Sequence, residues 1–424
     1  MNPKTPKPLP PARSIALEAL SRCLLSGLDI QSTLDTALSA RPADPRDAGL
    51  ATEIAYGYLR HKGRLEYLLA RFLKDPSRLP PKMRLGMGVA AYEIVFLDKV
   101  PAYASVDWAV EFAKTKPDAR LSGLFNAVLR RVAELGETAH DPDFYRKDAS
   151  GPEFLTRWFS CPQWIADLWR RAYGEEDALA YLEAQLNPPA LGINLHGHPE
   201  ADELYTELAA LPEVMDIEGM SFALPPGTVF EEEPEPPLAR QSFAARQVME
   251  RLDPSGWPGP VWDACAGRGG KTRILREKGI EVLASDLHRG RLAALEREMP
   301  DVTIFAADAA TDSPPRTPGT VLLDLPCSGL GVLSRRPDTK WKRTLRDLDD
   351  LTRLQAAILD NAAAQVRPGG VLAIVTCTLN PDENQGLVRA FLATHPGASL
   401  RTEWTTPPDS PLNEFFYGAL VDLG

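Results

Sequence analysis

The sequence has no apolar run long enough to cross a membrane and no recognisable export signal. A membrane-spanning helix needs about 20 consecutive apolar residues, and no run in the 424 residues approaches that length. The first ten residues contain four prolines and two lysines but no apolar core, so the sequence predicts no secretion signal. Both features favour a cytoplasmic protein without a membrane partner.

The sequence is also poor in cysteine. Five cysteines are an odd and sparse set for a chain of this length, which excludes a disulfide framework and fits a reducing compartment. No spacing of Cys and His residues is typical of a zinc site, so we expect no metal. The cysteines are Cys23, Cys161, Cys265, Cys327 and Cys377.

An excess of positive charge is absent from the chain as a whole but present in its first third. The net charge is −11. Residues 1–135 carry 20 Lys and Arg against 14 Asp and Glu, whereas the rest carries 27 against 44. A basic region joined to an acidic one permits a polyanionic partner at the basic end. The alternative is a solvated basic face without a ligand.

The order of sequence patterns predicts a multidomain protein. Apolar residues recur at helical spacing over residues 12–135, and breakers such as Pro80-Pro81 separate five or six helices of an all-α bundle. Residues 136–152 have the composition of a linker. Residues 153–240 predict a small α+β middle domain with two helices followed by short strands.

From residue 241 to 424, strand and helix patterns alternate, which predicts an α/β Rossmann-like domain with a parallel sheet. A long helix is expected over 351–366, and residues 413–421 predict a terminal strand pair. The expected parallel strands are 260–264, 281–285, 302–306, 320–323 and 371–375.

Two of the expected strands are followed by a cysteine. Asp324-Leu-Pro-Cys327 comes after one strand, and Thr376-Cys377 comes after another. Ligands of open α/β sheets bind just outside the carboxyl ends of the strands, so two thiols there are placed for chemistry. The alternatives are that both cysteines are small core residues, since free Cys is among the most buried types, or that they form a redox switch.

A glycine-rich turn follows the strand at 260–264. Glycines let the backbone approach a ligand closely, but both the G-x-x-x-x-G-K-[ST] phosphate loop and the full G-x-G-x-x-G pattern are missing. Three acids, Asp263, Asp286 and Asp308, each follow or end a strand, and an acid after the second strand can accept hydrogen bonds from ribose hydroxyls. These features predict a nucleoside-containing cofactor, and we expect S-adenosylmethionine.

The C-terminal half resembles the Nol/Nop/Sun family of RNA (cytosine-5) methyltransferases. The matching segments are Asp263-Ala-Cys-Ala-Gly-Arg-Gly-Gly-Lys-Thr272, Asp308, Asp324-Leu-Pro-Cys-Ser-Gly-Leu-Gly331, Arg335-Arg-Pro-Asp338 with Trp341, and Thr376-Cys-Thr378 with Glu383-Asn384. The helical part resembles the NusB-like domain of the bacterial small-subunit ribosomal RNA (RsmB/Fmu-like) members. Its matching segments are Ala55-Tyr-Gly-Tyr-Leu-Arg60, Val100-Pro-Ala-Tyr-Ala104 and Asn126-Ala-Val-Leu-Arg-Arg131. The chain departs from the family at Gly267-Arg268, where Ala-Pro is usual, and at Thr378, where Ser is usual.

The resemblance implies methylation of carbon 5 of a cytosine in RNA, with 16S ribosomal RNA as the expected substrate. Adding a thiolate to carbon 6 makes carbon 5 nucleophilic, and a base must then remove the carbon 5 proton. The resemblance assigns attack to Cys377, product release to Cys327 and the cytosine edge to Asp324, while Lys271 favours the thiolate. The cofactor residues it implies are Cys265, Ala266, Gly267, Arg268, Gly269, Gly270, Lys271, Asp286, Arg291, Asp308 and Asp324.

Two other functions stay open from the sequence. A transfer RNA substrate would use the same chemistry, and a non-catalytic RNA-binding or antitermination factor would use the fold alone. We expect an RNA partner and a monomeric protein. A basic run could contact the phosphates beside the target base; its members are Arg335, Arg336, Lys340, Lys342 and Arg343.

Overall fold

A computed structural model describes residues 8–41, 43–115, 120–230 and 233–424. The chain folds into two compact units. The first takes its residues from the chain up to Arg171 and from Arg336–Lys342, and the second from Ala172–Arg335 and Arg343–Gly424. The fold class expected from the sequence is confirmed, whereas the domain limits 12–135, 153–240 and 241–424 stay a prediction. No helix in the described part of the chain is long and apolar enough to span a bilayer.

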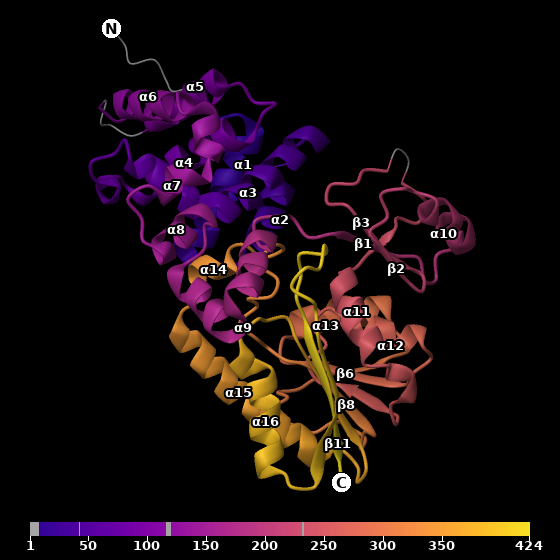
Figure 1. Ribbon diagram of the computed structural model, residues 1–424. Helices are drawn as coiled ribbons and strands as arrows, with labels where there is room; N and C mark the ends of the chain where they lie inside the picture. The colour runs from indigo at the N-terminus through magenta and orange to yellow at the C-terminus, as the bar shows by residue number, and fades with distance from the viewer. Residues whose placement is uncertain (1–7, 42, 116–119, 231–232) are drawn as a thin grey trace. The chain divides into compact units, whose positions relative to one another are not determined.

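The first unit is built from helices (Figure 1). Asp29 and Asp44 cap α2 and α3, because each carboxylate accepts a hydrogen bond from a backbone N–H of the first turn. The buried Glu93 carboxylate accepts hydrogen bonds from Arg13, Ser105 and Trp108, and so joins α1, α4 and α5. Five or six helices were predicted for this region, and the structure has α1 Pro11–Ser26, α2 Ile30–Ala40, α3 Pro45–Ala70, α4 Pro81–Phe96, α5 Ala102–Ala113 and α6 Arg120–Ala133.

The prediction of a linker over residues 136–152 is wrong. This segment forms a 3-10 turn at Gly136–His140, then α7 at Pro142–Arg146, and it leads into α8 at Gly151–Trp158. Tyr145 is fully buried, and its hydroxyl donates to the Ala139 carbonyl at 2.7 Å. The Pro, Gly, Asp and Ser residues that suggest a linker serve here as helix caps and first-turn residues.

A segment from the later part of the sequence, Arg336–Lys342, completes the first unit, and we call it the strap. Trp341 on the short helix α14 (Thr339–Lys342) donates from Nε1 to the Leu59 carbonyl of α3 at 2.7 Å. The neighbouring Gly63 leaves room for the indole, since a Cβ built there would lie 3.2 Å from the Trp341 ring. The Lys62 ammonium lies 4.3 Å from the centre of the same ring.

The strap also places a lysine inside the first unit. Lys340 is 1% exposed and donates from Nζ to the Arg60 carbonyl at 2.9 Å. Burial lowers its pKa to about 7. Lys342 pairs with Asp338, and Arg335 pairs with Glu414 in the second unit. The prediction that this basic run contacts RNA phosphates is therefore wrong for Lys340. Arg335, Arg336 and Lys342 have acidic partners within the fold, and Arg343 donates to the Ser328 carbonyl.

The second unit contains a seven-stranded sheet with the order β10-β11-β9-β8-β5-β6-β7. The strands are β5 Val261–Asp263, β6 Val282–Asp286, β7 Thr303–Ala306, β8 Thr320–Asp324, β9 Val371–Thr376, β10 Ala398–Thr405 and β11 Tyr417–Leu423. The five predicted parallel strands are confirmed. For the strand pair predicted within 413–421, one strand is confirmed, since β11 begins there. The position of the other is wrong, because its antiparallel partner β10 comes earlier in the sequence. That edge strand is mostly polar and exposed, so it gives no apolar signal.

Helices cover both faces of this sheet (Figure 1). Successive strand residues point to opposite faces of the sheet. Leu322 therefore packs against the helices on one face, and Leu323 packs against the helices on the other face. We call these helices the first and the second group. The first group is α11 Phe243–Arg251, α12 Gly270–Glu277 and α13 Arg289–Glu298; the second is α15 Leu345–Gln365 and α16 Gln385–Thr394. Helix α15 begins six residues before the expected position, because Thr344 and Asp347 form a capping box.

A small four-stranded antiparallel sheet precedes the large one, with the order β2-β3-β1-β4. Its elements are β1 Leu191–Asn194, α10 Ala201–Ala209, β2 Asp216–Glu218, β3 Ser221–Leu224 and β4 Ala239–Arg240. The long helix before it, α9 (Gln163–Ala184), is interrupted at Gly174, whose φ of +85° is in the region that favours glycine. The α+β pattern predicted for this part of the sequence is confirmed.

Candidate active site

The two cysteines that follow strands lie against each other. Strands β8 and β9 are parallel neighbours in the sheet, so their carboxyl ends meet at one edge. The Sγ atoms of Cys327 and Cys377 are 3.2 Å apart, and the Cys377 backbone N–H donates to Cys327 Sγ at 3.4 Å. Both residues are partly exposed, whereas Cys23 and Cys161 are buried. The interpretation of Cys327 and Cys377 as core residues is therefore wrong.

A buried carboxylate ties the two cysteine loops together. Glu383 accepts hydrogen bonds from the Ser328 backbone at 2.8 Å and from the Asn380 side chain at 3.0 Å. The Thr378 hydroxyl lies 2.6 Å from the Ser328 hydroxyl, which adds a second link. The departure of Thr378 from the usual Ser therefore keeps the hydroxyl that joins the loops. Glu383 is fully buried, so these bonds are not weakened by water.

The segment before β11 closes the same site. Gly331 donates to the Cys377 carbonyl at 3.0 Å and accepts from the Phe415 N–H at 2.8 Å, and a Cβ on Gly331 would lie 2.2 Å from the Phe415 oxygen. Buried Glu414 accepts a bidentate pair of hydrogen bonds from Arg335 at 2.6 and 2.8 Å. Sequence reasoning missed Glu414, because its apolar neighbours made this stretch resemble a strand. An acid directly before two phenylalanines was the available signal.

Lys271 and Asp324 form an ion pair near the thiols, with Nζ and Oδ2 2.7 Å apart. Burial alone would lower the pKa of Lys271, but its contact with Asp324 and, to a smaller extent, Cys377 raises that pKa above the ordinary lysine value. The hydrogen bond with Cys377, and then burial, raise the pKa of Cys327 well above that of a free thiol. The site thus contains a fixed cation and a protonated thiol beside Cys377.

The glycine-rich turn, Cys265–Gly270, connects β5 to α12. Gly269 has φ +80° and faces α13 so closely that a Cβ would lie 2.2 Å from Leu295 Cδ1. The Gly267 N–H donates to Asp286 Oδ2 at 3.0 Å. Asp286 thereby holds the turn, and its other oxygen accepts from the His288 N–H at 2.7 Å at the start of α13.

The remaining strand-end acids surround this turn. Asp263 is buried and accepts from the Thr272 hydroxyl at 2.6 Å, while its Oδ1 has no hydrogen-bond partner among the described residues. Burial raises the pKa of Asp263 to about 7. Arg291 lies 3.6 Å from Asp286, and Asp308 accepts from the Ala310 N–H in the loop after β7. An orphaned buried oxygen and glycines in the turn fit a cofactor that carries an amino group and a ribose.

Comparison with known proteins decides the family. The profile described as 16S rRNA methyltransferase RsmB/F matches residues 252–414, and the NusB family profile matches residues 10–134. The ribosomal RNA small subunit methyltransferase B of Thermus thermophilus is 32% identical over 382 residues, which cover 89% of this chain and 86% of that protein. The protein of the same name from Vibrio vulnificus is 31% identical over 444 residues, covering 95% and 98%.

The chain belongs to the ribosomal RNA small subunit methyltransferase B family. The predicted assignment to an RNA methyltransferase enzyme is therefore confirmed. The solved structure of PH0851 has the same fold over 98% of this chain, with a TM-score of 0.75 at 21% identity. A methyltransferase homologue from Pyrococcus horikoshii matches 65% of this chain with a TM-score of 0.52 at 20% identity.

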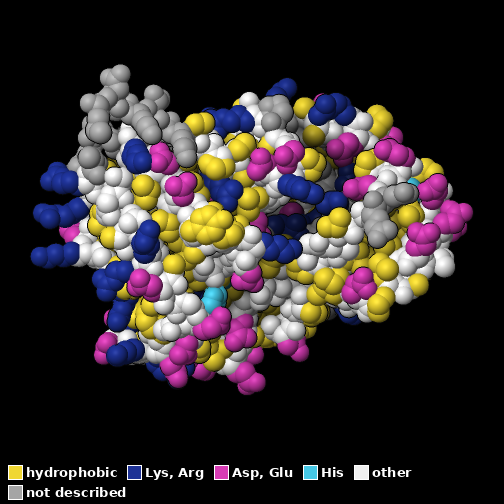
Figure 2. Space-filling model, turned by 90° about the horizontal axis from the view of Figure 1, so that it is seen from above, with side chains coloured by type: hydrophobic (Ala, Val, Ile, Leu, Met, Phe, Trp, Pro, Cys, Tyr) yellow, Lys and Arg dark blue, Asp and Glu magenta, His cyan; other side chains and the backbone are white. Residues whose placement is uncertain are grey.

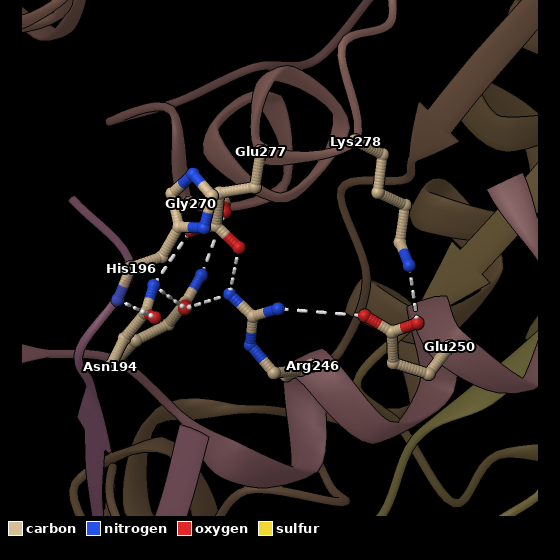
Figure 3. Close-up of polar contacts among 8 residues, drawn as sticks. Asn194, His196, Arg246, Glu250, Gly270, Glu277 and Lys278 are labelled. Atoms are coloured by element: carbon tan, nitrogen blue, oxygen red, sulfur yellow. Dashed lines mark hydrogen bonds and ion pairs between the residues drawn. The ribbon is translucent and has the colours of Figure 1, made fainter. Parts of the chain in front are cut away.

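In this member of the methyltransferase B family, a polar network joins α12 to α11 and β1 (Figure 3). Arg246 on α11 forms a buried ion pair with Glu277 at the end of α12, and Asn194 of β1 donates to the same carboxylate at 2.7 Å. Gln241 donates from Nε2 to the Gly270 carbonyl at 2.9 Å. The network joins the small sheet to the helix that begins at the glycine turn. Among the described residues, no cluster of three or more His, Cys, Asp or Glu side chains could hold a metal ion.

Proposed function

We propose that this chain methylates carbon 5 of a cytosine in 16S ribosomal RNA through a covalent bond between Cys377 and carbon 6 of the base. The observation that carries the proposal is the 3.2 Å separation of the Cys377 and Cys327 sulfurs at the carboxyl ends of two neighbouring strands. The Lys271–Asp324 pair beside them supports it. The names of the relatives support ribosomal RNA of the small subunit as the substrate.

In the proposed reaction, the Cys377 thiolate adds to carbon 6 and the electrons of the 5,6 double bond move to carbon 5. Asp324, held by Lys271, contacts the polar edge of the cytosine. S-adenosylmethionine supplies the methyl group, as an electrophilic sulfonium, when it is bound. Carbon 5 takes that methyl group, a base removes the carbon 5 proton, and elimination of the Cys377 thiolate restores the double bond. We assign Cys327, whose sulfur lies 3.2 Å from that of Cys377, to assist this last step.

We assign cofactor binding to the residues around the glycine turn. The backbone of Cys265–Gly270 lets the cofactor approach closely, the Asp286 carboxylate accepts the ribose hydroxyls, and Asp263 Oδ1 accepts the amino group. Arg291 lies beside Asp286, and we also assign Asp308 to the cofactor site. The target cytosine must be unpaired when it enters the site, because a paired and stacked base hides carbon 6.

Two cysteine substitutions test the covalent mechanism. Cys377→Ala cannot bond to carbon 6, so it should bind RNA and cofactor but transfer no methyl group and leave no adduct. Cys327→Ala can still attack, but elimination should stall, and a protein–RNA adduct should survive denaturing electrophoresis. Methyl transfer is measured with radiolabelled cofactor, and Cys161→Ala serves as a control because Cys161 is buried in the first unit.

The opposite pattern would contradict the assignment. A stable adduct with Cys377→Ala but not with Cys327→Ala would make Cys327 the nucleophile. Full activity in both variants would remove covalent catalysis from the proposal. Bisulfite sequencing of 16S ribosomal RNA from a deletion strain tests the substrate. The cytosine that this chain methylates should lose its resistance to conversion by bisulfite in that strain.

A further inference from the structure

The first unit has an apolar pocket that the proposed reaction does not use. It lies where α3 ends and α4 begins, around the 3-10 turn Pro76–Arg78, and its volume is about 370 Å³. Apolar side chains form most of its wall, and a few polar groups stand among them. The lining residues are Glu66, Leu69, Ala70, Leu73, Asp75, Pro76, Ser77, Leu79, Arg84 and Met87.

The wall of this pocket is aliphatic and firmly packed. Leu69, Leu73, Leu79 and Met87 are all buried in the core of the first unit, so the wall is part of the folded core. Ala70, at the end of α3, is exposed, so its small side chain leaves the pocket accessible from solvent. Such a concave apolar surface suits a flat ring, which can lie against the methyl groups with its polar edge toward the opening.

The chain around the pocket is basic. Residues 71–84 contain five Lys and Arg and a single acid. Lys74, Lys82 and Arg84 are exposed and form no ion pair with any described residue, and the Arg78 side chain is 84% exposed. Figure 2 shows Lys and Arg side chains projecting along the outer edge of the helical unit, at the left of the view.

The two acids of the lining already have partners. Glu66 pairs with Lys62, with 2.9 Å between Oε1 and Nζ. The Asp75 carboxylate accepts hydrogen bonds from the Ser77 N–H and hydroxyl and lies 3.8 Å from Arg78. The exposed charge left around the pocket is therefore positive, which favours a polyanion.

We propose that this pocket binds an unpaired nucleotide of the RNA substrate, with the base against the aliphatic wall and the flanking phosphates against Lys74, Lys82 and Arg84. The inference depends on the proposed RNA substrate but adds a second contact, separate from the cytosine that is methylated. An apolar peptide side chain would also fit the wall, but it would leave the surrounding cations without a role. A single-stranded RNA accounts for both features.

Charge reversal tests the phosphate contacts. The full-length double variant Lys74→Glu/Lys82→Glu is compared with Arg46→Glu/Lys99→Glu, a matched control. Arg46 and Lys99 are also exposed cations of the first unit without an ion pair to a described residue, and both lie outside the segment 71–84 that surrounds the pocket. Binding of a fluorescent single-stranded RNA is measured by anisotropy at several salt concentrations. The pocket variant should weaken binding more than about tenfold and flatten the salt dependence, whereas the control should change the dissociation constant less than about threefold.

Filling the pocket tests the base contact. Ala70→Trp should occupy the space and weaken binding of single-stranded RNA severalfold while leaving the salt dependence unchanged, because no phosphate contact is lost. Ala70→Ser, which leaves the pocket open, is the control. Thermal melting followed by circular dichroism establishes that the four variants are folded. The proposal would be overturned if both charge-reversal variants bound RNA equally weakly, or if Ala70→Trp bound RNA as the wild type does. An apolar peptide side chain would then be the better ligand for the pocket.

Methylation kinetics separate this inference from the proposed function. With wild-type chemistry intact, the pocket variants should raise KM for RNA and leave kcat unchanged, since they touch none of the reacting groups. Active wild-type protein with an unaltered KM in the pocket variants would reject the pocket alone. A wild-type protein that methylates no cytosine would contradict the proposed function. The anisotropy comparison between the pocket variants and their controls would still test whether the pocket binds RNA.

Discussion

At the scale of single residues, the carboxylates at the strand ends differ in the hydrogen bonds that they accept from the protein. Asp286 accepts two backbone N–H groups, one in the glycine turn and one at α13. Asp286→Ala should therefore weaken S-adenosylmethionine binding by about 1–3 kcal/mol, because it removes the proposed ribose acceptor and frees the turn. Calorimetric titration measures the change. Asp301→Ala is the control, since Asp301 is an exposed partner of Arg276. Unchanged affinity would move the ribose contact to another residue.

Asp263 gives a prediction about pH. Its pKa is about 7 in the folded protein, well above that of an exposed aspartate, because it is buried. Between about pH 4 and 7 the folded state therefore binds more protons than the unfolded state, and the stability from this group falls as pH rises, by up to about 1.4 kcal/mol per pH unit. Asp263→Asn should remove that slope. Urea unfolding at pH 4.5, 5.5 and 6.5 measures the free energy of unfolding of both proteins. The same dependence of that free energy on pH in both would show that the Asp263 carboxyl is not buried as described.

The sequence shows which residues stand at strand ends better than it shows the residues that hold them. Cys327, Cys377 and Asp286 all follow or end apolar strands, and a strand end is recognisable from the sequence. Glu414 and Asn194 act through partners that are distant in the sequence, Arg335 and Glu277. Such pairings depend on tertiary contacts that no local pattern contains, so the sequence did not indicate them.

At the scale of secondary-structure elements, α12 depends on the buried ion pair between Arg246 and Glu277. Arg246→Met should destabilise the protein by about 3–5 kcal/mol, because it leaves the buried Glu277 carboxylate without its countercharge and with only the hydrogen bond from Asn194. The double variant Arg246→Met/Glu277→Met should recover much of that loss. Lys278→Met, which removes a more exposed pair with Glu250, should change stability by less than about 1 kcal/mol. Urea denaturation measures all three variants, and equal losses in Arg246→Met and Lys278→Met would contradict the assignment.

Elements were predictable where their residues are apolar and buried. Strands β8 and β9 are mostly Val, Leu and Ile and almost entirely buried, and the structure has them within a residue of the expected positions. Edge strand β10 is exposed and mostly polar, so it carries no such signal. The short helix α7 is stabilised by a cap and by Tyr145 in the core, and a five-residue helix shows no periodicity.

At the scale of the whole molecule, the strap changes what truncation should do. The sequence predicts that deleting residues 1–135 weakens RNA binding and spares cofactor binding. The structure shows that this deletion also removes α3, the partner of Trp341 and Lys340. We now expect the truncated protein to aggregate, because an indole and an aliphatic lysine stem lose their cover. Light scattering measures aggregation.

A second truncated protein distinguishes the causes. Replacing Arg336–Lys342 with a Gly-Ser linker in the same deletion, and also removing residues 136–158, whose Tyr145 and Trp158 pack in the same core, should restore solubility and calorimetric binding of S-adenosylmethionine. Aggregation of both proteins would mean that the second unit requires the first for other reasons. A soluble deletion with the strap intact would contradict the role given to Trp341.

The strap also sets an order of events during synthesis. Its seven residues leave the ribosome about 165 residues after Arg171, a delay of roughly 8–30 s at ordinary bacterial elongation rates. Over that interval the carbonyls of Leu59 and Arg60 have no Trp341 or Lys340 to bind. The first unit of the nascent chain is therefore completed only after Cys327 has been translated, so a ribosome that stalls earlier releases a helical unit that is still open.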